Sequence, residues 1–151
     1  MTTCIELPCA AEKLLAHRPP MLLISRLLER QGERAVAEAI IPEDGLFVDP
    51  RKGLLPEYLI EIIAQTLAAT SGYDALLANS PATDGFLVGV DNFSWQTPTA
   101  KPGIAHIHIE KTFEFAGFTI VHGQVFQGTH LLAEGDIKVW ENTAQEKTDN
   151  A

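Results

Sequence analysis

Basic residues are scarce in this chain of 151 residues, which has 11 lysines and arginines against 20 aspartates and glutamates. The resulting formal net charge of −9 argues against a nucleic acid or an anionic membrane as the main partner, since either would need a basic face. No apolar run approaches the roughly 20 residues of a membrane-spanning helix. The N-terminal segment lacks the basic flank and apolar core of a signal peptide. We therefore expect a cytoplasmic protein.

Cysteine is also scarce, with only Cys4 and Cys9. A disulfide between them would close a short loop, and no second pair exists to build a zinc site, so reduced structural thiols are expected. His106 and His108 share one face of a predicted strand and could in principle bind a metal ion. A metal site also needs a third ligand and supporting residues, and the sequence suggests only Glu110, so an ordinary exposed strand face is favoured. We expect no metal and no cofactor.

Apolar residues make up 46% of the chain and charged residues 21%, which is typical of a globular protein. The length suits one compact domain covering residues 1–151. Residues from 141 onward are polar and are expected to form a frayed tail.

One long helix is predicted over residues 56–78, where Pro56 suits the first turn. The segment is apolar on almost every side, which is typical of a buried helix. Its one polar stripe consists of Glu57, Glu61 and Gln65, which share a face at spacings of four residues. A short helix is expected over residues 10–16.

The rest of the chain is predicted to be strands, because apolar and polar residues alternate between turn-forming glycines and prolines. Gly117 and Gly128-Thr129 are the expected hairpin turns. The long apolar helix and these strands together predict an α+β fold in which a curved antiparallel sheet wraps around one central helix. Its strand edges favour pairing with a second subunit. The predicted strands cover residues 21–30, 34–42, 86–95, 104–117, 118–127 and 130–140.

Three motifs follow in the order found in one known family. Residues 17–26, HRPPMLLISR, are similar to an HRxPFLLVDR segment, and residues 61–65, EIIAQ, match an ExxAQ signature. Residues 88–91, then Pro98 and residues 101–103, follow an AGID…P…PGD pattern. Over about residues 14–140 the chain therefore resembles the hotdog-fold 3-hydroxyacyl-[acyl-carrier-protein] dehydratases. The resemblance implies the hotdog fold.

One departure from that family concerns its catalytic histidine, which lies in a GHFPG loop ahead of the central helix. Residues 46–53 occupy that place here and contain no histidine. They look more like a divergent branch with an F-x-D-x-x-G-x-x-P loop, which Phe47, Asp49, Gly53 and Pro56 match approximately in spacing. Members of that branch are called dehydratase-like, and some accompany aryl-polyene lipid synthesis.

The resemblance implies that Glu61 supplies one half of the acid–base chemistry of dehydration, at a tunnel between subunits. A carboxylate on an apolar helix is itself a typical acid–base candidate. Asp49 either supplies the second half, paired with Glu61 of a partner subunit, or caps the turn at Pro50. His17 is expected to have a structural role next to the site, rather than to act as the base.

A substrate-binding role is expected for four further residues. By resemblance, backbone donors near the helix start and the strand at Gly89 would hold the thioester carbonyl, as an oxyanion hole does. The residues assigned to substrate binding are Phe47, Gly53, Gln65 and Gly89.

The leading functional hypothesis is dehydration of a 3-hydroxyacyl thioester in fatty acid or polyene lipid synthesis. One alternative is an acyl thioesterase in which a carboxylate activates water. Another is a non-catalytic hotdog subunit of a heterodimer, or an acyl-binding protein. The acyl group would be carried by acyl carrier protein or coenzyme A, and the assembly would be a homodimer, a higher oligomer or a heterodimer with another hotdog subunit. Acidic carrier proteins would be repelled by the net charge unless Arg51 and Lys52 form a local docking site.

Overall fold

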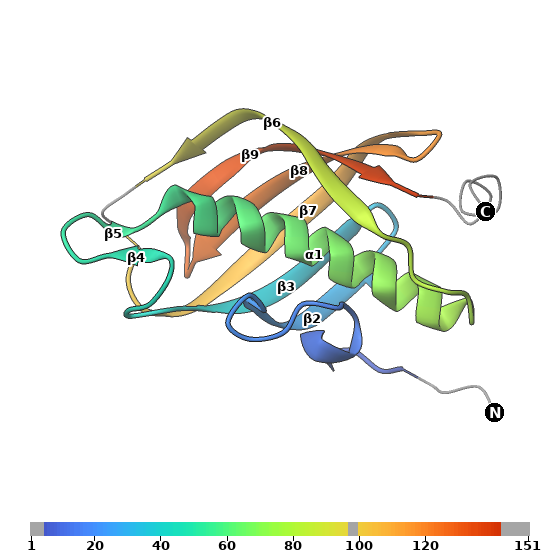
Figure 1. The fold of residues 1–151 in the computed structure, drawn as a ribbon, viewed down its shortest axis with the longest axis horizontal. Coiled ribbons are helices and arrows are strands. Elements are labelled where there is room, and N and C mark those ends of the chain that lie inside the picture. The colour runs from blue at the N-terminus through green and yellow to red at the C-terminus, as the bar shows by residue number, and fades with distance from the viewer. Residues whose placement is uncertain (1–4, 97–99, 143–151) are drawn as a thin grey trace.

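The computed structural model describes residues 5–96 and 100–142, in which a strongly curved antiparallel sheet packs one face against one long helix (Figure 1). The strand order is β1-β2-β3-β7-β8-β9-β6, and β4 and β5 form a separate small hairpin. This confirms the predicted sheet around a central helix. The elements are β1 (Cys9–Ala10), a 3-10 turn η1 (Ala11–Lys13), β2 (Ile24–Gln31), β3 (Arg34–Ile41), β4 (Val48–Asp49), β5 (Gly53–Leu54), α1 (Pro56–Leu77), β6 (Gly85–Trp95), β7 (Gly103–Phe115), β8 (Phe118–Gln127) and β9 (His130–Glu141).

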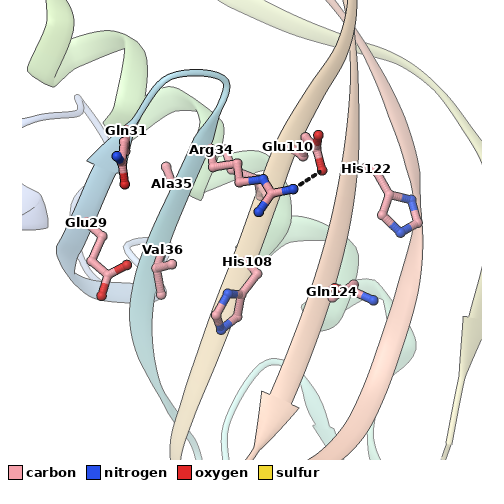
Figure 2. Close-up of a pocket in the computed structure, with 10 residues that line it drawn as sticks. Glu29, Gln31, Arg34, Ala35, Val36, His108, Glu110, His122 and Gln124 are labelled. Carbon is pink, nitrogen blue, oxygen red and sulfur yellow. Dashed lines mark ion pairs between the residues drawn. The ribbon is translucent and has the colours of Figure 1, made fainter.

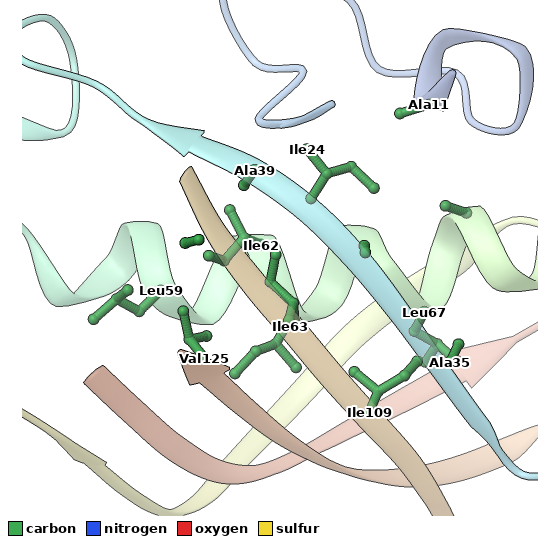
Figure 3. Packing of buried hydrophobic residues seen from close by; sticks show 14 of the residues in the cluster. Ala11, Ile24, Ala35, Ala39, Leu59, Ile62, Ile63, Leu67, Ile109 and Val125 are labelled. Atoms are coloured by element: carbon green, nitrogen blue, oxygen red, sulfur yellow. The ribbon is translucent and has the colours of Figure 1, made fainter. Parts of the chain in front are cut away.

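Helix α1 is apolar on most sides because the sheet curves around it. Leu59, Ile62 and Ile63 are fully buried in one core with inward-facing strand residues such as Ile109 and Val125 (Figure 3). Each such side chain contributes roughly 1.5–3 kcal/mol through burial. One stripe of the helix remains outside this core, and it carries Glu57 and Glu61.

The hairpins at β7–β8 and β8–β9 lie where the glycines predicted them. Ala116 and Gly117 both have positive φ, of 49° and 87°, as a two-residue type I′ hairpin requires. Strand β9 extends through Glu141, the residue at which the polar tail was expected to start. Residues 143–151 lie outside the described part of the chain.

Two predicted elements differ from the structure. The helix expected over residues 10–16 is a single 3-10 turn, Ala11–Lys13, because so short a segment without a side-chain N-cap does not sustain an α-helix. The strand expected from residue 21 begins at Ile24. Cys9 is a free, buried thiol, while its predicted neighbour Cys4, and Pro98 of the third motif, lie outside the described residues.

Strand β6 is the last strand of the sheet, and apolar side chains are exposed along it. Phe86, Leu87, Val88 and Trp95 retain between 46% and 57% of their surface. An exposed apolar edge strand is a template for pairing with another chain. No helix in the described residues is long and apolar enough to cross a membrane.

Candidate active site

Gln65 joins the helix to the chain that precedes β2. Its side-chain oxygen accepts the backbone N–H groups of Leu23, at 2.9 Å, and Ile24, at 3.4 Å. Its nitrogen donates to the Met21 carbonyl at 2.7 Å and to Glu61 Oε1 at 2.9 Å. Because each partner fits only one amide end, the orientation is fixed. Gln65, which was predicted to bind substrate, is 1% exposed and supports Glu61 from within the core, so its role in substrate binding stays a prediction.

His17 lies on the other side of the same carboxylate. Its Nε2 is 3.7 Å from Glu61 Oε1, and the two side chains are 39% and 28% exposed. The second ring nitrogen, Nδ1, is buried and has no hydrogen-bond partner among the described residues. An imidazole placed beside a half-exposed carboxylate is able to exchange a proton with it through a bridging group.

These residues line a groove of about 580 Å³ that runs along the exposed stripe of α1. His17, Glu61 and Gln65 all belong to it, together with Ala64 and Ala68 of the helix. The opposite wall is formed by the start of β6, including Phe86 and Leu87. The carboxylate therefore faces a space large enough for a small organic ligand.

Asp49 is placed differently from Glu61. Its Oδ1 accepts the backbone N–H groups of Arg51, at 2.7 Å, and Lys52, at 2.8 Å, which is a turn cap. Hydrogen bonds from the Lys52 and Arg51 backbone lower the pKa of this carboxyl. Asp49 does not line the groove within one chain. Its pairing with a partner's Glu61 remains a prediction.

The other residues predicted to bind substrate also lie outside this groove. The Phe47 ring packs edge-to-face on Tyr58, with centroids 5.7 Å apart, as part of the apolar core. Gly53, with φ of 81°, allows the β4–β5 hairpin to close. Gly89 lies in β6 opposite Lys138.

Two groove residues were missed by the sequence-based interpretation. Glu141 was assigned to the polar tail, yet its Oε1 accepts a hydrogen bond from the Ser71 hydroxyl at 3.3 Å. Ser71 lies on the exposed helix stripe, ten residues after Glu61. Steps of three or four residues connect the two positions, and this spacing could have placed Ser71 on the same face of the helix as Glu61.

A second hollow, of about 380 Å³, lies on the sheet face turned away from α1 (Figure 2). Its side chains include the Arg34–Glu110 ion pair, at 3.6 Å, and His108 and His122. His122 Nδ1 donates a hydrogen bond to Asp136 Oδ1 at 2.8 Å, and that hydrogen bond raises the pKa of the imidazole. No group of metal-ligating side chains forms among the described residues. This hollow therefore has the features of a solvated strand face.

A family model described as ApeP dehydratase matches residues 9–149, almost the whole chain. The chain belongs to the ApeP-like family. The Glu61 groove thus lies in a dehydratase-like protein, as the order of the three sequence motifs implied. A search of curated proteins found no match.

The solved structures most like this fold include the dehydratase heterocomplex ApeI:P from Xenorhabdus doucetiae, with a TM-score of 0.81 and 19% identity over 97% of this chain and 98% of that one. A conserved protein from Pseudomonas aeruginosa has a TM-score of 0.62 and 11% identity, covering 87% and 98%. A hypothetical thioesterase with coenzyme A from Streptococcus pneumoniae has a TM-score of 0.56 and 9% identity, covering 77% and 84%. At these identities the likeness establishes the hotdog fold.

Proposed function

We propose that this ApeP-like chain takes part in dehydrating 3-hydroxyacyl thioesters and that Glu61 is its acid–base residue. The observation that carries the proposal is the Glu61 carboxylate itself. It lies in an open groove, held at Oε1 by Gln65 over 2.9 Å and flanked by His17 at 3.7 Å. Family membership supports the reaction class, and the groove supports an elongated substrate.

The chemistry requires one proton to leave C2 and one to reach the departing 3-hydroxyl. We assign the first transfer to Glu61, which takes the proton as the C2–H bond breaks. Protonated His17 gives its proton to the hydroxyl as the C3–O bond breaks and the C2–C3 double bond forms. Water leaves, and a proton passing from Glu61 to His17 restores both groups. Each transfer contributes about 10²–10⁴-fold to the rate.

The proposal includes a hotdog partner at the exposed β6 edge. The solved structure with a TM-score of 0.81 is a dehydratase heterocomplex, ApeI:P, which supports a second subunit for this chain as well. The apolar side chains on β6, Phe86 and Val88 among them, support pairing along that strand. A homodimer would use the same edge. A partner subunit would also bring its own loop residues to the groove, in place of the histidine absent from residues 46–53.

We further propose that the complex works in the cytoplasm, in fatty acid or polyene lipid synthesis, on substrates carried by acyl carrier protein or coenzyme A. The specific alternative is a non-catalytic subunit that supports a catalytic partner. It is favoured by the heterocomplex relative and by the absence of a histidine from residues 46–53.

The deciding experiment supplies one 3-hydroxyacyl thioester, on either carrier, to the chain alone and to the chain with a co-encoded hotdog partner. Enoyl product is followed by mass spectrometry, and free thiol is followed in the same samples. Enoyl product that depends on Glu61 is the expected result. Thiol without enoyl product would show a thioesterase instead. Activity of the complex that survives Glu61→Gln would assign the chain a supporting role.

A further inference from the structure

Helix α1 contains a glycine at residue 72, well before it ends at Leu77. Glycine is the least favourable helix residue after proline, because it loses the most backbone freedom on folding. Gly72 is buried, and it lines the Glu61 groove together with Leu14. Its presence inside the helix therefore calls for a reason other than helix formation.

The reason is a close approach between Gly72 and the backbone of Leu14. A Cβ atom at residue 72 would overlap the Leu14 carbonyl oxygen and would lie 2.8 Å from the carbonyl carbon. Both atoms belong to the backbone, so rotation of a side chain could not relieve the overlap. The N-terminal segment, blue in Figure 1, thus crosses α1 more closely than a residue with a side chain would allow. Leu14 itself is 5% exposed, and its N–H donates to the Ala11 carbonyl at 2.9 Å.

His17 follows this crossing point by three residues. Three residues span at most about 11 Å, so the position of Leu14 limits where the imidazole can lie. Arg18 restrains the histidine further, because its Nη1 donates to the His17 carbonyl at 2.7 Å. Beyond it, the Gln65 side chain donates to the Met21 carbonyl at 2.7 Å. The segment is therefore held against α1 on both sides of His17.

We infer that Gly72 is a positioning residue for the acid–base pair: with no side chain there, the N-terminal segment lies close enough to α1 to place His17 Nε2 3.7 Å from Glu61 Oε1. The inference rests on the proposed function for the roles of His17 and Glu61. A methyl group at residue 72 would displace the Leu14 backbone by roughly 1 Å. A misplacement of about 1 Å caused by a distant substitution can lower a rate by about 10²-fold.

The first measurement follows the position of His17 and does not depend on turnover. Ring signals of histidine-labelled protein are recorded by NMR in the complex with the hotdog partner, and His17→Asn assigns the His17 signals. We expect Glu61→Gln to shift these signals in the wild-type background, because the two side chains are close. In the Gly72→Ala background the same substitution should leave them nearly unmoved.

The second measurement is turnover of a 3-hydroxyacyl-coenzyme A by the same complexes. Gly72→Ala is expected to lower kcat by about tenfold to a hundredfold while KM stays within about threefold of wild type. His17→Asn should then cost much less in the Gly72→Ala background than in wild type, since one interaction cannot be lost twice. A loss of stability alone would leave the two effects additive.

Gly123→Ala is the matched control. A Cβ atom there would press on the Ile63 side chain of the same helix, away from the N-terminal segment. This variant should keep the NMR response to Glu61→Gln and a kcat near that of wild type. Leu14→Ala loosens the same crossing from the other side and takes the place of Gly72→Ala if that variant does not fold.

The inference is overturned if the His17 signals do not respond to Glu61→Gln in wild type, if they still respond in Gly72→Ala, or if the effects of Gly72→Ala and His17→Asn on kcat are additive. A lost NMR response without enoyl product from any complex would uphold the placement of His17 by Gly72 and reject the proposed reaction. Enoyl product that His17→Asn does not reduce would reject the role proposed for His17, and the NMR response alone would then decide the placement.

Discussion

Gln65 donates a hydrogen bond to Glu61 Oε1 at 2.9 Å while its other amide atom accepts the backbone N–H of Leu23. One buried side chain thus positions the candidate acid–base carboxylate and also anchors the chain that enters β2. The ExxAQ and HRPPMLLISR motifs, far apart in sequence, meet at this residue. Both of the contacts that Glu61 makes with these two side chains, Gln65 and His17, fall on Oε1. We therefore propose Oε2 as the oxygen that takes the substrate proton.

Replacing Glu61 with Gln should remove enoyl product formation while leaving the fold intact. The amide keeps the size of the side chain but cannot take a proton from C2, so the rate should fall by at least about 10²-fold. Single-turnover assays of the complex measure this rate, and circular dichroism checks the fold. Glu57→Gln, on the same helix but outside the groove, is the matched control. A Glu61→Gln complex with wild-type turnover contradicts the assignment.

Replacing Gln65 with Leu should destabilise the protein by about 2–4 kcal/mol. The change removes the hydrogen-bond partner of the part-buried Met21 carbonyl and Leu23 N–H, at about 1–3 kcal/mol for each such group. Urea unfolding measures the free energy. Gln124→Leu, in which the lost hydrogen bond is to Glu134 on the outer sheet face, should stay within about 0.5 kcal/mol. Equal effects of the two variants would show that Gln65 is not a structural anchor.

The same contacts explain which parts of the fold were predictable. The apolar helix and the alternating strands follow from local patterns, so their positions could be inferred residue by residue. The start of β2 could not be, because the Leu23 N–H and the Met21 carbonyl are taken by Gln65, a residue more than forty positions away. Such a long-range hydrogen bond leaves no trace in local periodicity.

The site was predictable only in part for a similar reason. Glu61 stood out because a carboxylate on an apolar helix is unusual, and family resemblance pointed to the same residue. The approach of His17 to Glu61 depends on how the N-terminal segment crosses the helix, which sequence spacing does not encode. Glu141 was hidden by its polar neighbours, since the pattern of the tail resembled a frayed end.

The two interpretations of Asp49 are separated by a pair of substitutions. Asn accepts the Arg51 and Lys52 backbone N–H groups as Asp does but cannot act as an acid or base. If Asp49 serves as the turn cap, Asp49→Asn should retain turnover, while Asp49→Ala should loosen the β4–β5 hairpin. Turnover of the complex and hydrogen exchange of the hairpin amides are the measurements. Loss of turnover in Asp49→Asn would establish the acid–base role.

Protonation of His122 should stabilise the fold at acid pH. The hydrogen bond to Asp136 raises the folded-state pKa of His122 above its ordinary value of 6.5. Its contribution is therefore fully present below pH 6.5 and is lost as the pH rises through the folded-state pKa. Unfolding midpoints of wild type and His122→Gln should differ most at low pH and converge at alkaline pH.

His108 supplies a control of opposite sign. Burial lowers the pKa of this imidazole, with the charge of His106 acting in the same direction, so protonation opposes folding as the pH falls below 6.5. His108→Gln should therefore become relatively more stable than wild type at acid pH. The same pH dependence for both variants would contradict the local assignments of charge.

A charge placed on the β6 edge should prevent subunit association without unfolding the chain. Val88 is 57% exposed, and Lys at this position would tolerate water but not burial in an apolar interface. Light scattering after gel filtration should show Val88→Lys dissociated from its hotdog partner where wild type is associated. Ile104→Lys, at a 55% exposed site on β7, is the matched control and should remain associated. Both variants replace a similarly exposed aliphatic side chain with lysine, but on different strands. A loss of association confined to Val88→Lys would therefore locate the interface on β6. Dissociation by Ile104→Lys alone would place it on another strand.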